Sequence, residues 1–233
     1  MNKSPLQLLL LSGVKKYHWN NTVFYLRLGK VAQRQLSPSK STKEWRRTEK
    51  RAKANNNFAG MRILSSHMKD VYEGLPVWEH ATKFRTNNTM TADNYRHKVN
   101  HAYVNEFGEV IDHKHLVVSD GSLVLPLNMT MVRKDNMITL TWEDHRDTPS
   151  AKESDIPHAI VIGSHRNDAL MLVHRTTPAT RGSGTVTFKV NAREKENLHI
   201  YPFFGNDENE AFSPNEYFFA PWAGQVPAEA PVQ

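Results

Sequence analysis

A stretch of basic residues between positions 34 and 53 is the feature of this sequence with the clearest chemistry for binding a ligand. Lysines and arginines dominate it, one tryptophan lies among them, and Glu44 and Glu49 are its only acidic residues. On a helix these cations would lie on more than one face. A phosphate backbone would neutralise them with release of counterions, and the indole could stack on a base. The candidate residues for nucleic-acid or polyanion binding are Arg34, Lys43, Trp45, Arg46, Arg47, Lys50, Arg51 and Lys53.

The charge of the whole chain is divided unevenly, and this division leaves a second interpretation open. Residues 1–100 hold 19 Lys and Arg against 6 Asp and Glu, a net charge of +13, whereas residues 101–233 hold 11 against 18, a net charge of −7. The basic helix could therefore face the acidic half, a neighbouring subunit or water. No groove-reading motif accompanies it, so we expect a solvated or protein-facing surface and keep polyanion binding as the alternative.

Histidine is abundant, with 12 residues, and two pairs have a spacing that metal sites use. His97 and His101 are four apart on a predicted helix, while His113 and His115 would share one face of a strand near Asp112. The glutamate that follows the first histidine in the metalloprotease motif is absent next to His97. His113 and His115 would share a face of any strand, because alternate residues of a strand always do. We therefore expect surface or partly buried histidines, and no metal site or cofactor.

The sequence holds no arrangement of residues typical of catalysis. It has no cysteine, which excludes a thiol nucleophile, a thiolate metal site and a disulfide framework. Gly182-Ser183-Gly184 lacks the five-residue pattern of a nucleophile elbow, and no glycine-rich phosphate loop is present. Glu143 and Asp144 would point to opposite faces of a strand and so could not share a proton. We predict that the chain is not an enzyme.

A group of aromatic residues towards the C-terminal end suits the core and edge of a β-sandwich. A carbohydrate-binding surface would need these rings on one outer face, and it is the less favoured alternative. The residues are Phe203, Phe204, Tyr217, Phe218, Phe219 and Trp222.

A small β-meander and a long helix would position the basic residues. Residues 17–36 place the turn signals Asn20-Asn21 and Gly29-Lys30 between runs rich in Val, Phe, Tyr and Leu. Ser41 and Glu44 form a capping box that would begin the helix after this meander.

The long helix has an imperfect apolar stripe and a clear end. We expect it to bend or break near Asn55-Asn56-Asn57 and to stop at Gly74, before Pro76. Between residues 77 and 94 the apolar residues follow no clear helical or strand period. Thr91 would then cap a shorter helix that runs through Tyr103.

After residue 108 the apolar residues follow the period of strands, divided by turn signals such as Asp120-Gly121 and Asp135-Asn136. Seven or more short strands at this spacing predict a two-sheet sandwich. The strand that ends in Trp142 resembles the second strand of fibronectin type III-like domains. The predicted strands are His115–Val118, Ser122–Leu125, Met129–Arg133, Met137–Trp142, Ala159–Ser164, Leu170–His174, Thr185–Val190, Leu198–Phe204 and Glu216–Ala220.

Four segments together resemble a family of bacterial proteins catalogued only as a domain of unknown function. They are Thr22-Val23-Phe24-Tyr25 before Gly29-Lys30, residues 51–60, residues 117–123 with the sequence VVSDGSL, and residues 138–144 with the sequence ITLTWED. The resemblance implies a similar layout, a basic N-terminal part followed by a sandwich. It implies no activity and supplies no catalytic residue.

These observations predict a mainly β protein with α elements (α+β), in which an Ig/fibronectin type III-like sandwich follows a β-hairpin and a helical region. We expect a basic region at 1–110, a sandwich at 111–220 and a flexible tail at 221–233. The apolar run at residues 6–11 is too short for a membrane span and no cleavage pattern follows it, so we expect no secretory signal and favour the cytoplasm. The predicted function is a structural or interaction protein that binds a protein partner or itself, with nucleic acid or another polyanion as the alternative partner.

Overall fold

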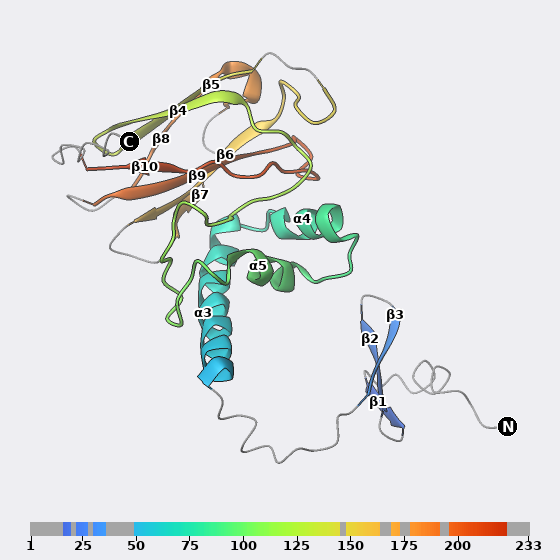
Figure 1. Cartoon of the computed structure of the whole chain (residues 1–233). Helices are drawn as coiled ribbons and strands as arrows, with labels where there is room; N and C mark the ends of the chain where they lie inside the picture. The colour runs from blue at the N-terminus through green and yellow to red at the C-terminus, as the bar shows by residue number, and fades with distance from the viewer. Residues whose placement is uncertain are drawn as a thin grey trace, which may run out of the picture. The chain divides into compact units, whose positions relative to one another are not determined.

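The computed structural model describes residues 16–19, 22–27, 30–35, 49–144, 148–163, 169–172, 178–191 and 196–222, and the helix residues 49–57 by their backbone alone. The chain divides into two compact units, Met1–Ala52 and Lys53–Gln233 (Figure 1). We call them the small unit and the large unit, and describe each by itself. Among the described residues, no helix is both long enough and apolar enough to cross a bilayer.

The small unit contains an antiparallel meander with the strand order β1-β2-β3. β1 pairs with β2, from Trp19↔Thr22 to Lys16↔Tyr25, and β2 pairs with β3, from Arg27↔Lys30 to Thr22↔Gln35. The meander predicted for residues 17–36 is therefore confirmed. The strands are β1 (Lys16–Trp19), β2 (Thr22–Arg27) and β3 (Lys30–Gln35).

The long helix α3 (Glu49–Tyr72) is continuous, so the bend predicted near Asn55-Asn56-Asn57 is wrong. Asparagine costs a helix only a few tenths of a kcal/mol per residue, which is too little to break a helix of this length. The predicted end is confirmed: Gly74 has a φ of +87° and Pro76 follows it. The proposed capping box at Ser41 lies outside the described residues.

Two shorter helices follow, and the first was not predicted. α4 (Val77–Thr86) occupies a stretch that lacks an obvious apolar period, and it buries one side through Val77, Trp78, Ala81 and Thr82. α5 (Ala92–Asn100) is capped as predicted, because the Thr91 hydroxyl accepts a hydrogen bond from the backbone N–H of Asn94 at 3.3 Å. It ends at Asn100, earlier than the predicted Tyr103.

Seven strands form two antiparallel sheets with the orders β4-β5-β8 and β10-β9-β6-β7. Each overlaps a predicted strand, and the α+β, mainly β class is confirmed. The three-stranded sheet comprises β4 (Leu127–Lys134), β5 (Met137–Glu143) and β8 (Thr185–Lys189). The four-stranded sheet comprises β6 (Ile156–Gly163), β7 (Ala169–Leu172), β9 (Leu198–Gly205) and β10 (Phe218–Ala220).

The predicted strands His115–Val118 and Ser122–Leu125 are wrong, because both segments are irregular. Side-chain amides take the place of a neighbouring strand along the first one. Asn100 exchanges two hydrogen bonds of 2.8 Å with the backbone of Val117. An extended segment paired to side chains satisfies its backbone groups without belonging to a sheet.

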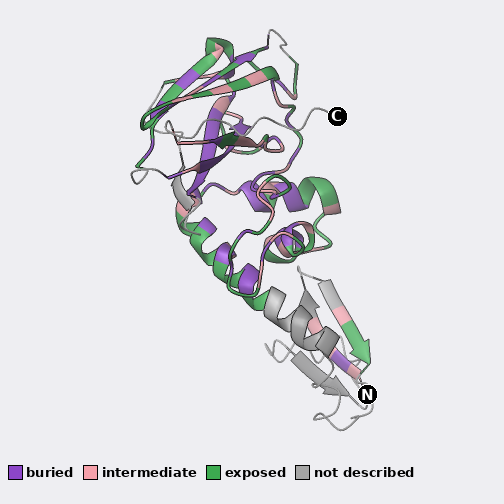
Figure 2. Cartoon of the chain, turned by 60° about the vertical axis from the view of Figure 1, so that its left-hand side comes forward, coloured by how far each residue is buried: buried purple, intermediate pink, exposed green. Residues whose placement is uncertain are grey.

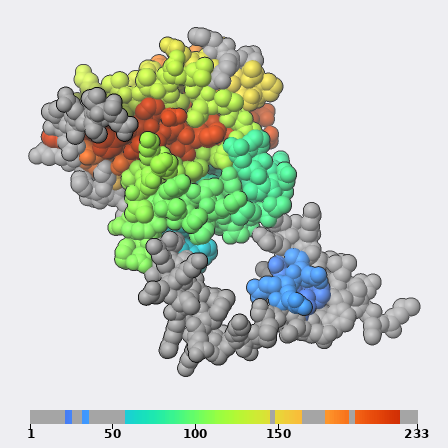
Figure 3. All heavy atoms as spheres, viewed as in Figure 1, coloured from blue at the N-terminus to red at the C-terminus, as the bar shows by residue number. Residues whose placement is uncertain are grey.

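The four-stranded sheet is the middle one of three layers. Along β9, Leu198, Ile200 and Phe204 face the three-stranded sheet, whereas Tyr201 and Phe203 face the helices. Strands β6 and β9 are consequently buried along almost their whole length. Figure 2 shows buried residues on the central strands and on one side of each helix, and Figure 3 shows the helical layer packed directly against the strands.

A buried ion-pair cluster closes one end of the sandwich. The fully buried guanidinium of Arg181 contacts Asp144 at 2.5 Å and Asp155 at 3.1 Å, and it lies over the ring of Phe204. The indole of Trp142 donates to the Arg181 carbonyl at 2.7 Å. These contacts hold strand β5, the 3₁₀ turn at residues 181–183 and strand β9 together.

Candidate functional site

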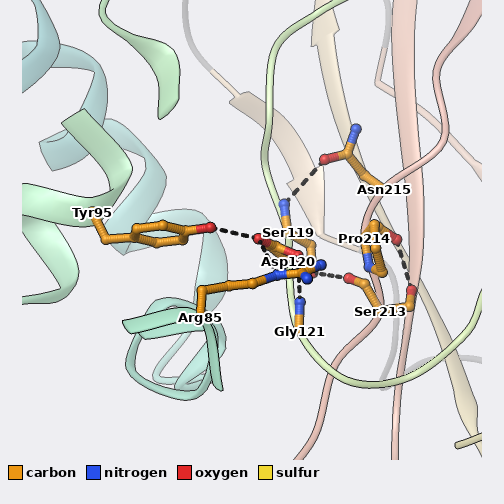
Figure 4. A network of polar contacts seen from close by, with 8 residues as sticks. All are labelled: Arg85, Tyr95, Ser119, Asp120, Gly121, Ser213, Pro214 and Asn215. Carbon is orange, nitrogen blue, oxygen red and sulfur yellow. Dashed lines mark hydrogen bonds and ion pairs between the residues drawn. The ribbon is translucent and has the colours of Figure 1, made fainter. Parts of the chain in front are cut away.

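In the described part of the large unit, an extensive polar network surrounds residues 116–121, a segment between the helices and the four-stranded sheet. Figure 4 shows Arg85 and Tyr95 reaching it from the helical side, and Ser213 and Asn215 from the sheet side. Residues 117–121 of this segment belong to the VVSDGSL sequence. We call the contacts made by Asp120 and its neighbours the Asp120 junction.

The Asp120 carboxylate lies at the centre of the junction and is fully engaged. The guanidinium of Arg85 donates to both oxygens, at 2.7–3.1 Å. The Tyr95 hydroxyl donates to Oδ2 at 2.7 Å, and the backbone N–H of Gly121 donates to Oδ1 at 2.8 Å. Because both oxygens already accept at least two bonds each, this carboxylate is arranged to join α4 and α5 to the segment rather than to accept a proton from a substrate.

The electrostatics of the junction favour a charged Arg85 guanidinium and a neutral Tyr95 phenol. Hydrogen bonding to Asp120 raises the pKa of Arg85 above its ordinary value. Burial raises the pKa of Tyr95 to about 12, and the hydrogen bond to Asp120 adds to this effect. The Arg85 guanidinium therefore stays charged and the Tyr95 phenol stays neutral across the physiological pH range.

Towards the sheet, the side chains of Asn215 and Ser119 bond to backbone groups. The Asn215 amide oxygen accepts from the N–H groups of Val118 and Ser119, at 2.8 and 3.2 Å. The Ser119 hydroxyl donates to the Ser213 carbonyl at 2.7 Å and is fully buried. A serine whose proton is held by a carbonyl inside the core is positioned to fix the fold and not to act as a nucleophile.

Two histidines, His199 of β9 and His113 of the irregular segment before β4, form a second polar contact in the large unit. The rings of His113 and His199 stack with centroids 3.5 Å apart and an interplanar angle of 7°. Each Nδ1 contacts a tyrosine hydroxyl, that of Tyr201 at 2.8 Å and that of Tyr217 at 3.0 Å. Burial lowers the pKa of His199 to about 4, with a further contribution from His113, and burial also lowers the pKa of His113. Both rings are thus held neutral at pH 7.

The histidines weighed as metal ligands do not converge. His97 and His101 stack with centroids 5.6 Å apart beside Phe58, whereas His113 packs on His199 and His115 pairs with Asp112. In the part of the chain that the structure describes, no three His, Asp or Glu side chains are grouped to hold an ion.

A polar groove of about 490 Å³ separates α3 from α5. Met61 and His97 line it together with Arg62, Lys69 and Asp93. Lys69 lies 3.5 Å from Asp93, and Arg96 also contacts this carboxylate. The Asp93 carboxylate at this groove is therefore already paired with two cations, Lys69 and Arg96.

The predicted polyanion-binding residues are only partly within the described structure. Arg34 lies on β3, opposite Val23, and is exposed. Lys50, Arg51 and Lys53 lie on α3, where the backbone alone is described. The positions outside the described residues are Lys43, Trp45, Arg46 and Arg47. That these cations together bind a polyanion stays a prediction.

A comparison of the sequence with known protein families gives a match that includes the segment of the Asp120 junction. A family model described as a family of unknown function, DUF6266, matches residues 36–213. The chain belongs to the DUF6266 family. The match covers the helices, the VVSDGSL segment and most of the sandwich, so the predicted resemblance is confirmed, while the bacterial origin stays a prediction. No curated protein matches the chain.

The first prediction concerns the Asp120 junction of this DUF6266 protein. Asp120→Asn should lower the free energy of unfolding by about 1.5–3 kcal/mol, because it removes charged hydrogen bonds and turns an amide N–H₂ towards existing donors. Urea unfolding at pH 7 measures the effect. Asp135→Asn, at the exposed β4–β5 turn with a φ of +53°, is the control and should be nearly neutral. Equal effects for the two variants would show that the junction does not hold the fold together.

The second prediction concerns the stacked histidines. Because the pKa values of His113 and His199 are lowered in the folded chain, the unfolded chain takes up protons first as the pH falls below about 6.5. Their contribution to stability is therefore present above that pH and is lost towards pH 4. His199→Phe should flatten the fall in unfolding free energy between pH 7 and pH 5, whereas His67→Gln, an exposed histidine of α3, should keep the wild-type slope. An unchanged slope for His199→Phe contradicts this assignment.

Proposed function

We propose that this DUF6266 protein is a non-enzymatic structural protein that acts as a component of an assembly. The observation that carries the proposal is the use of its buried and partly buried polar groups. Asp120, Ser119, Asn215 and Arg181 each bond to other parts of the fold, and each joins segments far apart in the sequence. A molecule whose ionisable groups connect its own layers is built for rigidity, and a rigid body is suited to presenting surfaces to partners.

The strand arrangement supports a display role. Among the described strands of the large unit, three face four. β4 and β5 lie in the three-stranded sheet, β6 and β7 lie in the other, and β8 returns to the sheet of β4 and β5. This order, together with the edge-on contact of Trp142 with Phe204 at 5.2 Å, favours an Ig/fibronectin type III-like sandwich. Such sandwiches serve many unrelated functions, so the proposal depends on the surfaces of this chain and not on the architecture.

The third prediction tests this function in the native source. The full chain, isolated under mild conditions, should be found in a particle heavier than its own 26.7 kDa, and nuclease treatment should not change the particle's mass. Mass photometry or light scattering after size exclusion gives the answer. A 26.7 kDa species as the sole form in the native extract would overturn the proposal.

A second function, polyanion binding by the small unit, is favoured by one specific observation. Met1–Ala52 holds 12 Lys and Arg against 2 Asp and Glu, a net charge of +10, whereas Lys53–Gln233 holds 18 against 22, a net charge of −4. The division of the chain into two compact units thus nearly coincides with the change from net positive to net negative charge along the sequence. A concentrated positive charge on one compact unit attracts phosphate chains in a salt-dependent way.

The fourth prediction tests the polyanion alternative. Replacing Arg46, Arg47, Lys50 and Arg51 by Ser should lower the salt concentration at which the chain elutes from heparin, and should reduce the salt dependence of DNA binding by up to about 0.9 per lost phosphate contact. The control replaces four exposed lysines of the large unit, Lys83, Lys98, Lys114 and Lys152. Co-elution of the two quadruple variants would exclude the basic segment as the binding site.

A further inference from the structure

The outer face of the three-stranded sheet is an ordered array of small side chains with little charge at its centre. The strand register places Thr130 beside Thr141 and Thr185 in one row, and Val132 beside Thr139 and Thr187 in the next. These side chains alternate with the buried ones, so they project away from the sandwich core. We call this surface the threonine face.

The hydroxyl groups of the threonine face bond within the sheet. Thr130 and Thr141 share a hydrogen bond of 2.6 Å, and Thr139 and Thr187 share one of 3.0 Å. Thr185 donates to the Leu140 carbonyl at 3.1 Å. Because the hydroxyls are satisfied and the β-branched side chains are stiff, the face presents fixed methyl groups that lose little entropy when they are covered.

Large apolar side chains extend this face and are unusually exposed. Val132 is 63% exposed, Leu127 is 58% exposed and Met137 is 41% exposed. Val132 and Met137 are diagonal neighbours on β4 and β5, and exposed apolar groups that lie together favour burial against a partner.

Charged residues lie at the two ends of the threonine face, with opposite sign at each end. Glu143 lies beside Leu127 at one end of the sheet. Lys134 and Lys189 lie on either side of Met137 at the other end. All three charged side chains are exposed, and Glu143 accepts a hydrogen bond from the Asn128 amide at 3.0 Å.

We propose that the threonine face packs against the same face of a second copy of this chain. A two-fold axis in the plane of the interface and perpendicular to the strands reverses the strand direction. It places Glu143 of one copy over Met137 of the other, between Lys134 and Lys189. The row that contains Thr130 then lies over the row of the other copy that contains Val132. The alternative axis, parallel to the strands, would set like charges together, so charge selects the first arrangement. This inference rests on the proposed structural function and names one partner for it.

The size of the face sets the expected strength of the dimer. Three strands about 4.8 Å apart, with seven residues of about 3.3 Å each, cover roughly 14 Å by 23 Å. This is below the roughly 800 Å² per partner of a standard interface. The dimer should therefore be weak and concentration-dependent, with assembly elsewhere in the particle adding to it by multivalency.

The fifth prediction uses charge reversal on the full-length chain, measured by sedimentation velocity between about 5 and 500 μM, the range in which a weak dimer dissociates. The wild type should shift from monomer to dimer across this range. Glu143→Lys alone, and the double variant Lys134→Glu with Lys189→Glu alone, should each remain monomeric. An equimolar mixture of these two variants should form a heterodimer, because each supplies the charge that the other lacks.

The controls separate this dimer from a loss of folding and from the proposed function. Glu208→Lys, an exposed change outside the threonine face, should dimerise as the wild type does, and circular dichroism should show that every variant is folded. A monomeric wild type at the highest concentration, undiminished dimerisation of Glu143→Lys, or a mixture that stays monomeric would each overturn the inference. If the purified chain is monomeric while the native particle is large, the dimer is excluded and the structural function stands.

Discussion

The burial of the four-stranded sheet on both faces is the constraint on which the rest of the large unit depends. Strands β6 and β9 have no solvent-facing side, because the three-stranded sheet covers one face and the helical layer the other. A sheet with two apolar faces cannot be stable in water without both covers. The helices that precede the sandwich in the sequence are therefore part of its core, and the large unit is a three-layer body.

The Asp120 junction follows from that constraint. The chain must pass from the helices to the sandwich through residues 101–126, and the part of it at 116–121 runs between two layers where backbone groups cannot all reach water. Side chains of Asn100, Asn215 and Asp120 bond to this segment or to the helices beside it, at 2.7–3.3 Å. The Asp120 junction is thus explained by packing, which is why the proposed function depends on outer surfaces rather than on a pocket.

The sequence predicted the strands better than the layers. Met137–Glu143 and Thr185–Lys189 alternate between apolar and polar residues because one face of each strand is exposed, and their period was clear. Ile156–Gly163 and Leu198–Gly205 are nearly continuous apolar runs, the pattern of strands covered on both faces, and this signal for the helical cover was available in the sequence. The α4 helix was missed because its apolar stripe is only two turns long. The partners of Asp120 come from segments 25 and 35 residues away, and no local pattern predicts such contacts.

Native-state hydrogen exchange of the full chain, followed amide by amide in low concentrations of denaturant, tests most directly whether the helices and the sandwich form one body. The account predicts that the slowest amides of α4 and α5 exchange with the same opening free energy, and the same dependence on denaturant, as those of β6 and β9, because all four elements unfold together. Helix amides that open several kcal/mol more easily than the central strands, with a smaller dependence on denaturant, would show that the helical layer is a separate structure resting on a self-sufficient sandwich.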